Sequence, residues 1–420
     1  MMLKLKLFIL LLIGTFGFSQ TKALYEKSVE AYKSKDYVQF LKLAKQLDSI
    51  RPAHPTFTYN LASAYTLNGK KEEALLVLKR MVLANNTVAF EDDSDFESIK
   101  NDNGFKELLQ LKVSQSKTIK NSVEKLRLSE KDLHPEGLFY LEKQKLWLSS
   151  SIRNKKIVSF DSSGKCSDWF TDCLYSVFAL KADHDQKYLW VVCSAIPEMN
   201  GFAKELDGKS EILKIEISSK KLIKRYTIEG NHVFGDIAVA KNNDVFISDS
   251  AEPIIYKIEN DNLILWKDLR NKAFNLQGIT FNKNESKLFI ADYLKGICVV
   301  DIKSKKEHWL EFPNEVSKKG IDGLVYYKNS LIAIENGVVP IRIMRYKLND
   351  SETKIIDFTI LDNNREEFNE PALAALVHDK LYFFANSPWK FYDKNFQLDE
   401  GKFENPKLFE LDLEKPLSKF

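Results

Sequence analysis

Short apolar segments separated by polar turns recur along the C-terminal two thirds of the chain. In six places a polar or small residue leads directly into an apolar segment, and a second apolar segment follows. These places are Glu136-Gly137-Leu138, Ser176-Val177-Phe178, Asp236-Ile237-Ala238, Gln277-Gly278-Ile279, Asp322-Gly323-Leu324 and Pro371-Ala372-Leu373. Their first residues lie 40, 60, 41, 45 and 49 positions apart. A strand-rich repeat of about 40–50 residues predicts a β-propeller, here with six blades.

The second apolar segments have the length of propeller strands, and each follows a polar turn. They are Leu146–Leu148, Tyr188–Val191, Val245–Ile247, Lys287–Ile290, Leu331–Ile334 and Leu381–Phe384. Third strands are predicted at Lys156–Phe160, Ile255–Ile258 and Gly296–Val300. The longer step after Ser176 leaves room for a loop around 197–210 that could overhang one face.

The residues that open the innermost strands are expected to meet in space, because the innermost strand of every blade faces one central channel. Four of them carry carboxylate or amide side chains: Glu136, Asp236, Gln277 and Asp322. Such oxygen ligands suit a hard cation. The alternative is that these side chains are solvated residues of a water-filled channel.

The apolar period changes to that of helices in the N-terminal part of the chain. Tyr32 and Tyr65 each follow an alanine and lie 33 residues apart, and apolar residues three and four apart predict helices at Val38–Leu47 and Glu72–Val82. This pattern resembles the tetratricopeptide repeat, a helix–turn–helix unit of about 34 residues. The groove of such repeats usually binds a peptide, and the alternative is a helical bundle without a ligand.

The first residues are typical of a secretory signal. Two lysines precede an apolar run at 7–18 that is too short to span a bilayer as a stable helix. Gly17 and Ser19 provide the small residues of a cleavage site before Gln20. The mature protein is therefore expected in the periplasm or outside the cell, with an uncleaved membrane anchor as the alternative. No later segment is long and apolar enough to span a membrane.

Length and charge limit the other choices. The chain has 420 residues, 44% of them hydrophobic and 12% aromatic, which is enough for two substantial cores. A net charge of +3 gives no reason to expect nucleic acid or a membrane surface as partner. The predicted organisation is a signal peptide at 1–19, helical repeats at 20–120, a charged linker at 121–132 and the propeller at 133–420.

The four cysteines divide into two groups. Cys193 and Cys298 lie in apolar segments and are expected to be buried strand residues. In an exported chain, Cys166 could pair with Cys173 across a short loop. The alternative, that neither of these two is paired, stays open.

The openings of the blades resemble those of the senescence marker protein/gluconolactonase/luciferin-regenerating family, which are six-bladed propellers with a divalent metal in the channel. The resemblance covers the chain from about Leu133 onward. The family's Glu-Gly motif matches Glu136-Gly137, and its Asp-Gly motif matches Asp322-Gly323. Where the family has Asn-Gly and Asn-Asp, this chain has Gln277-Gly278 and Gly235-Asp236. One ligand is therefore a longer amide, and another lacks its side chain.

The resemblance implies a divalent metal, with Ca²⁺ as the first choice and Zn²⁺ or Mn²⁺ as alternatives, held by Glu136, Gln277, Asp322 and Asp236. In such a site the metal polarises a lactone carbonyl while a carboxylate activates water, and Asp322 would serve as both ligand and base. His134 and His232 precede Glu136 and Asp236 closely in the sequence. They are candidates for substrate binding at the channel mouth, and a turn or surface role is the alternative.

Two functions remain open at the level of sequence. The first is an exported metal-dependent hydrolase that acts on a lactone or a related ester. The second is a non-catalytic module whose helical repeats and propeller bind a protein, a peptide or a small ligand. Propellers serve both purposes, so the fold alone does not decide between them. Glu136 and Asp322 favour the hydrolase, whereas Gln277 and Gly235 favour the binding module.

Overall fold

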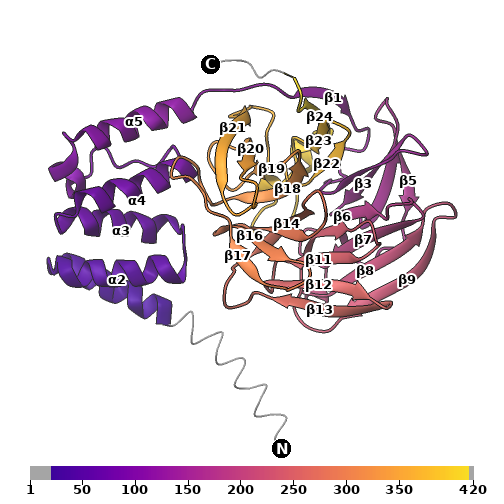
Figure 1. Cartoon of the computed structure of the whole chain (residues 1–420), viewed down its shortest axis with the longest axis horizontal. Coiled ribbons are helices and arrows are strands. Elements are labelled where there is room, and N and C mark those ends of the chain that lie inside the picture. Colours follow the sequence, from indigo (N-terminus) through magenta and orange to yellow (C-terminus); the bar gives the residue numbers. More distant parts are fainter. Residues whose placement is uncertain (1–19, 416–420) are drawn as a thin grey trace, which may run out of the picture. The chain divides into compact units, whose positions relative to one another are not determined.

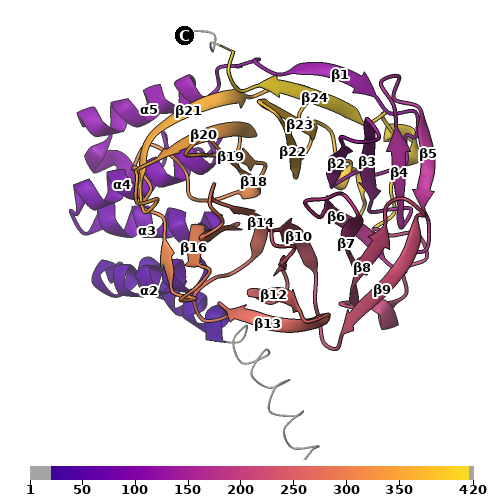
Figure 2. The same ribbon diagram turned by 45° about the vertical axis from the view of Figure 1, so that its right-hand side comes forward.

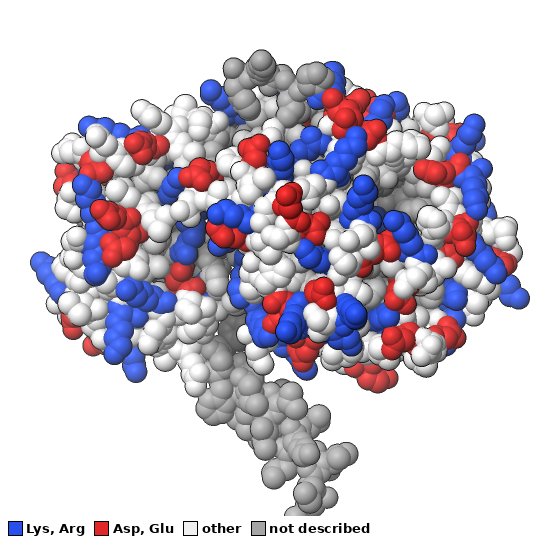
Figure 3. Space-filling model, in the orientation of Figure 1, with Lys and Arg blue, Asp and Glu red and all other residues white. Residues whose placement is uncertain are grey.

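The computed structural model describes residues 20–415, which form two compact units (Figure 1). The first unit extends to Ser116 and includes Asn314–Ser317, and the second comprises Lys117–Pro313 and the chain from Lys318 onward. The predicted signal peptide at 1–19 lies outside the described residues. On the face shown in Figure 3, basic and acidic side chains are interspersed. Within residues 20–415, no helix combines the length and apolar character needed to cross a membrane.

The first unit is helical. A helical segment at 20–33 is followed by α2 (Tyr37–Ile50), α3 (Pro55–Leu67), α4 (Lys71–Ala84), the 3₁₀ helix η1 (Ser94–Ile99) and α5 (Asn103–Gln115). Each α-helix from α2 onward packs against the next one along the chain. The predicted helices Val38–Leu47 and Glu72–Val82 lie within α2 and α4, which confirms the series of helix–turn–helix units. The assignment to the tetratricopeptide repeat stays a prediction.

Helix caps and small core residues explain this arrangement. The Asp36 carboxylate accepts a hydrogen bond from the Gln39 backbone N–H at 3.0 Å, which caps α2. Fully buried alanines, such as Ala44 and Ala62, let neighbouring helices approach closely. The aromatic rings of Phe90 and Phe105 meet edge to face at 5.3 Å near the C-terminal end of the unit.

The second unit consists of six four-stranded antiparallel sheets arranged as blades around a channel (Figure 2). The first three blades are β2 (Leu138–Leu141), β3 (Leu146–Ser151), β4 (Lys156–Phe160), β5 (Cys166–Phe170); β6 (Ser176–Ala182), β7 (Tyr188–Ser194), β8 (Ser210–Glu216), β9 (Lys221–Ile228); and β10 (Phe234–Val239), β11 (Val245–Asp249), β12 (Ile254–Glu259), β13 (Asn262–Asp268). The fourth and fifth are β14 (Leu276–Phe281), β15 (Lys287–Asp292), β16 (Gly296–Asp301), β17 (Glu307–Trp309); and β18 (Ile321–Tyr327), β19 (Ser330–Glu335), β20 (Arg342–Leu348), β21 (Ile355–Asn363). The sixth blade has β22 (Ala374–Val377), β23 (Lys380–Phe384) and β24 (Lys407–Asp412), with β1 (Val123–Arg127) as its outermost strand.

The six-bladed propeller confirms the predicted fold, and every predicted second and third strand coincides with an observed one, whereas the predicted opening Pro371-Ala372-Leu373 lies just before β22. The second strand of each blade is largely buried, as in β11 and β19, whose residues are all buried. The outermost strands are mostly exposed or half-buried, as in β9 and β13, each of which has a single buried residue. Short 3₁₀ turns, η2 (Lys204–Leu206), η3 (Trp389–Phe391) and η4 (Glu400–Lys402), lie in the two longest connections of the described propeller.

The segment 121–132 was expected to be a linker, and the structure corrects this. Its residues Val123–Arg127 form β1, which pairs antiparallel with β24 from Val123 opposite Glu410 to Arg127 opposite Lys407. The strand was not recognisable because it is outermost and mostly exposed, so its sequence carries charged residues in place of an apolar alternation.

All four cysteines are free thiols in the structure. Cys193 and Cys298 are buried, as predicted, and Cys173 is buried as well. Cys166 is part of the apolar cluster of Leu128 and Leu138, whereas Cys173 belongs to a different cluster with Val177 and Cys193. The structure therefore gives no support to a Cys166–Cys173 pair.

Candidate functional site

A β-bulge displaces the polar residues that open three of the innermost strands. In β18, Ile321 is opposite Glu335 and Leu324 is opposite Ala333, so Asp322 and Gly323 face a single residue of β19. The same shift of register occurs at Gly235-Asp236 in β10 and at Gln277-Gly278 in β14. A bulge of this kind re-aims a side chain out of the regular alternation of a strand. The repeated motif found in the sequence is thus a structural device that turns polar side chains towards the channel.

The glycines of these motifs allow neighbouring innermost strands to come close together. A Cβ atom on Gly323 would lie 2.1 Å from the carbonyl oxygen of Ala372, and one on Gly278 would lie 2.5 Å from that of Asp322. A Cβ atom on Gly137 would similarly lie 2.5 Å from the Phe178 carbonyl oxygen. Only glycine fits such approaches of one backbone to another. The motif glycines therefore fix the distance between blades at the level of the polar side chains.

Asp322 is held by an amide from its own blade. The side-chain N–H of Asn336 donates to Asp322 Oδ2 at 2.5 Å, and the Tyr293 hydroxyl donates to Asn336 Oδ1 at 3.0 Å. Burial raises the pKa of Asp322 to about 7, and the negative charges of Asp236 and Glu370 add to this rise while Asn336 opposes it. Asp322 is thus oriented by a neutral donor and can take up a proton near neutral pH.

Glu136 precedes β2 in the first blade, and an aromatic residue covers it. The indole N–H of Trp389 donates to Glu136 Oε2 at 3.2 Å. Burial holds the pKa of Glu136 well above its usual value, and the charge of Asp322 raises it further, whereas the Trp389 hydrogen bond acts in the opposite direction. Glu136 is therefore protonated more readily than an ordinary glutamate.

Glu370, which lies just before β22, is a third acidic residue at this end of the channel. Burial raises its pKa, and the charge of Lys390 lowers it. Its own charge raises the pKa values of Glu136, Asp322 and Tyr293, which shows that the four groups share one electrostatic environment. We call Glu136, Asp322 and Glu370 the acidic site.

The Asp236 carboxylate makes its hydrogen bonds within the channel wall. It accepts the backbone N–H of Ile237 at 2.8 Å and that of Ile279 at 2.9 Å, which ties β10 to β14. The side chain also lines a cavity of ≈ 290 Å³ with Lys181 and Lys241, and neither Glu136 nor Asp322 lines this cavity. The negative charge of Asp236 raises the pKa of Asp322, although the Asp236 side chain lines a different cavity from that of the acidic site.

Gln277 and Gly235 occupy adjacent positions in the channel wall. The Gln277 amide N–H donates to Asn275 Oδ1 at 2.5 Å. Its Oε1 lies 3.6 Å from the place where a Cβ atom of residue 235 would be. The Ser250 hydroxyl oxygen would lie only 2.7 Å from that Cβ atom, so a side chain at residue 235 would first meet Ser250, with Gln277 as a further neighbour.

The acidic site suits a divalent metal in charge but is not a closed ligand cluster. Three carboxyl groups with raised pKa values lie in one environment, and an excess of buried negative charge suits a cation. Between residues 20 and 415, however, no three His, Cys, Asp or Glu side chains are grouped closely enough to enclose a metal ion. The residues fit a divalent ion by charge, with Glu136 and Asp322 as its holders and amide and water oxygens as further ligands. Calcium remains a proposal.

The two histidine candidates have different surroundings. His134 is buried, its Nδ1 lies 2.8 Å from the Tyr392 hydroxyl, and its ring packs edge to face on Trp389 at 4.4 Å. Burial, helped by the charge of Arg153, lowers the pKa of His134 to about 3, so the ring is neutral and packs beside the residue that covers Glu136.

His232 lies in the connection to the third blade. Its Nδ1 is 2.6 Å from Asp249 Oδ2 and its Nε2 is 3.2 Å from the Glu229 carbonyl oxygen. The hydrogen bond with Asp249 raises the pKa of His232 and holds the start of the third blade in place. Substrate binding by either histidine stays a prediction.

Sequence reasoning missed Glu370, Asn336, Tyr293 and Trp389. Asn336 lies in a connection after a strand, and the other three also belong to connections without a repeated pattern. The one available signal was positional: Asn336 comes two residues after the predicted second strand Leu331–Ile334, and Glu335 before it is opposite Ile321, the first residue of the innermost strand.

No protein-family model matches the chain, and no curated protein shows significant similarity to it. Similar solved structures include the calcium-binding protein regucalcin from Agrobacterium tumefaciens (TM-score 0.48, 13% identity, 72% of this chain and 98% of that one). They also include a gluconolactonase from Xanthomonas campestris (0.46, 10%, 71% and 92%) and a luciferin-regenerating enzyme (0.44, 12%, 69% and 92%). Propellers of the kinds that the blade motifs resemble are thus among the similar structures. At these scores and identities, the role of each residue follows only from this chain's own side chains.

Proposed function

We propose that the acidic site hydrolyses a lactone or a related ester. The observation that supports this most is the pKa of Asp322, raised to about 7 by burial and neighbouring charges. A general base works best at neutral pH when its pKa is close to that pH. Glu136 beside it favours the protonated form, so the two carboxyl groups are suited to opposite tasks.

In this proposal each carboxyl oxygen would have its own task, which its hydrogen bonds support. Asn336 occupies Asp322 Oδ2, which leaves Oδ1 to take a proton from a water molecule as the water oxygen bonds to the carbonyl carbon. The ring C–O bond then breaks, and the departing oxygen takes a proton. Glu136 holds that proton on Oε1, because Oε2 accepts the Trp389 N–H. The product is a hydroxy acid. A divalent ion would instead be held by the ionised forms of Glu136 and Asp322 and would polarise the same carbonyl. Water would then supply the proton for the departing oxygen.

A recognition module is the second candidate. It is favoured by Asp236, whose oxygens are used by backbone N–H groups, and by Trp389, which lies over Glu136. In that case the propeller would bind a small ligand, and the helical unit would bind a protein or peptide. Export to the periplasm or the medium belongs to both proposals.

Turnover of a panel of lactones by the purified chain distinguishes the hydrolase from the recognition module. After removal of metals with a chelator, acid release is measured with and without Ca²⁺, Zn²⁺ or Mn²⁺, and the melting temperature is measured in parallel because a bound ion stabilises the folded state. We expect kcat/KM to rise with pH through about 7 as Asp322 ionises. Asp322→Asn should lower turnover by about 100-fold or more, and Glu136→Gln should also lower it.

Asp350→Asn is the matched control, because Asp350 is an exposed carboxylate in the turn after β20. It should leave both turnover and its pH dependence unchanged. If no lactone is hydrolysed under any of these metal conditions, the hydrolase proposal is wrong and the recognition module is the better description.

A further inference from the structure

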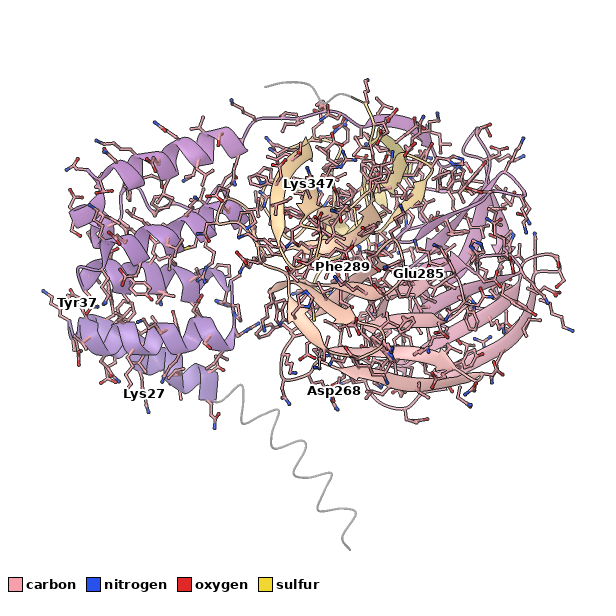
Figure 4. All side chains as sticks on the ribbon, in the orientation of Figure 1. Lys27, Tyr37, Asp268, Glu285, Phe289 and Lys347 are labelled. Carbon is pink, nitrogen blue, oxygen red and sulfur yellow. The ribbon has the colours of Figure 1, made fainter. Side chains whose placement is uncertain are left out.

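The channel has a second space, which we call the turn-side cavity. Its ≈ 290 Å³ are lined by the innermost strands beyond the bulges and by the turns that follow β10 and β14. This volume is at the lower end of small-molecule pockets, which span about 300–1,000 Å³. Glu285, one of its lining residues, is labelled in Figure 4.

Three lysines from three different blades line this cavity: Lys181, Lys241 and Lys283. Lys241 and Lys283 are exposed at the turns, and Lys181 is half-buried at the end of β6. In the part of the chain that the structure describes, none of the three has a carboxylate within ion-pair distance, whereas Lys328, in the corresponding turn of the fifth blade, pairs with Asp379 and Glu414 at 3.0 Å. The acidic residue at the mouth, Glu285, uses Oε2 to accept the Lys241 backbone N–H at 3.0 Å.

The remaining wall of the turn-side cavity is mainly apolar. Aliphatic and aromatic side chains come from four innermost strands, among them Ile237, Ile279, Phe281, Leu324 and Leu376. Asp236 supplies the negative charge, with its carboxylate bonded to two backbone N–H groups. The anionic group of a bound ligand would therefore lie near the lysines of the turns, and its apolar part would contact the strands.

We propose that the turn-side cavity binds an organic anion with an apolar body, of the class of a medium-chain carboxylate. The recognition is electrostatic at the mouth and hydrophobic inside. This binding is distinct from hydrolysis at the acidic site, because no residue of the acidic site lines the cavity.

Calorimetric titration of the full chain with octanoate tests the proposal, with 1-octanol and octyltrimethylammonium as neutral and cationic counterparts. We expect saturable binding of octanoate, weaker binding of octanol and none of the cation. The double variant Lys241→Ala/Lys283→Ala should weaken octanoate binding by about fivefold or more, since two exposed positive charges at the mouth are lost. Lys347→Ala is the control, because Lys347 is an exposed lysine of β20 away from Glu285 (Figure 4).

Three outcomes would overturn the proposal: no binding of octanoate, equal affinity for octanol and octanoate, or an unchanged affinity in the double variant. Lactone turnover in the double variant should equal that of the wild type. A failure of turnover in the wild type leaves the octanoate result unaffected.

A second inference rests on two buried thiols in the second blade. Cys193 in β7 is opposite Val177 in β6 and opposite Glu211 in β8. The Leu174 backbone N–H, directly after Cys173, donates to Glu211 Oε1 at 2.9 Å, and Arg225 links the same glutamate to the Asp172 carbonyl. The backbone on both sides of Cys173 is thus fixed beside Cys193, and both thiols belong to one apolar cluster.

We infer that Cys173 and Cys193 form a disulfide when the protein meets a thiol-oxidising partner. The two thiols lose two protons and two electrons, and a disulfide of the oxidant is reduced to two thiols. The bond would join the connection before β6 to the centre of the second blade.

Peptide mapping without reduction, after incubation of the full chain with glutathione disulfide, tests this pairing. We expect a cross-linked peptide that contains Cys173 and Cys193, and a higher melting temperature for the oxidised protein. Cys166→Ser should leave the bridge intact, whereas Cys173→Ser should remove it. A bridge between Cys166 and Cys173, or unbridged thiols throughout, would refute the inference.

Discussion

Asp322→Asn is expected to raise the free energy of unfolding at pH 8 by about 1–3 kcal/mol. The pKa of Asp322 rises from 3.8 to about 7 on folding, so the folded protein binds this proton more tightly than the unfolded chain. Stability from this group is fully present below pH 3.8 and is lost as the pH rises through about 7. Above that pH the wild type carries an ionised, largely buried carboxylate. Asparagine removes the charge and can still accept the Asn336 N–H.

The advantage of the variant should shrink as the pH is lowered from 7 towards 4, because the wild-type carboxyl group then becomes neutral in the folded state. Urea unfolding at several pH values measures this difference. Asp350→Asn should show no such trend, since that side chain is exposed. Equal stability of wild type and Asp322→Asn at every pH would contradict the assigned environment. A gain in stability together with a loss of turnover is typical of a catalytic residue.

Arg342→Ala is expected to lower the free energy of unfolding by about 3–5 kcal/mol. Arg342 Nε donates to Glu335 Oε2 at 2.7 Å, and the Tyr346 hydroxyl donates to Glu335 Oε1. The side chains of Arg342 and Glu335 are 5% and 0% exposed, so truncation leaves a carboxylate buried beside a single hydroxyl donor. Asn336, which donates a hydrogen bond to Asp322, directly follows Glu335. Loss of the Arg342 side chain should therefore also weaken that hydrogen bond.

Denaturant unfolding checks this prediction, with Lys354→Ala as the control for an exposed pair. Lys354 and Glu311 form an ion pair whose side chains are 50% and 66% exposed, so its loss should change stability by about 1 kcal/mol or less. Replacing both buried partners, as in Glu335→Leu/Arg342→Met, should recover part of the loss. Equal effects of Arg342→Ala and Lys354→Ala would show that the buried pair is not structurally important.

The blades could be predicted because their inner strands are apolar and their spacing is regular. Glu136, Gln277 and Asp322 could be found for the same reason, since the motif that opens the blades repeats. Asp236 shares that motif, but its hydrogen bonds to Ile237 and Ile279 depend on the approach of the next blade, which no local pattern records. Glu370 and Trp389 reach the channel only after the sixth blade is assembled, so the acidic site exceeds what the motifs alone indicate.

The ladder between β1 and β24 has a consequence for the kinetics of folding. It joins Val123 to Glu410, so the last blade contains both the first and the final strand of the propeller. Contacts between such distant positions form slowly, because a long loop must close before they are made. Until β24 has been synthesised, β1 and β23 lack their partner and expose free strand edges that favour aggregation. A chain that stops before Lys407 would therefore be an open ring, vulnerable to proteolysis, whatever the state of its first five blades.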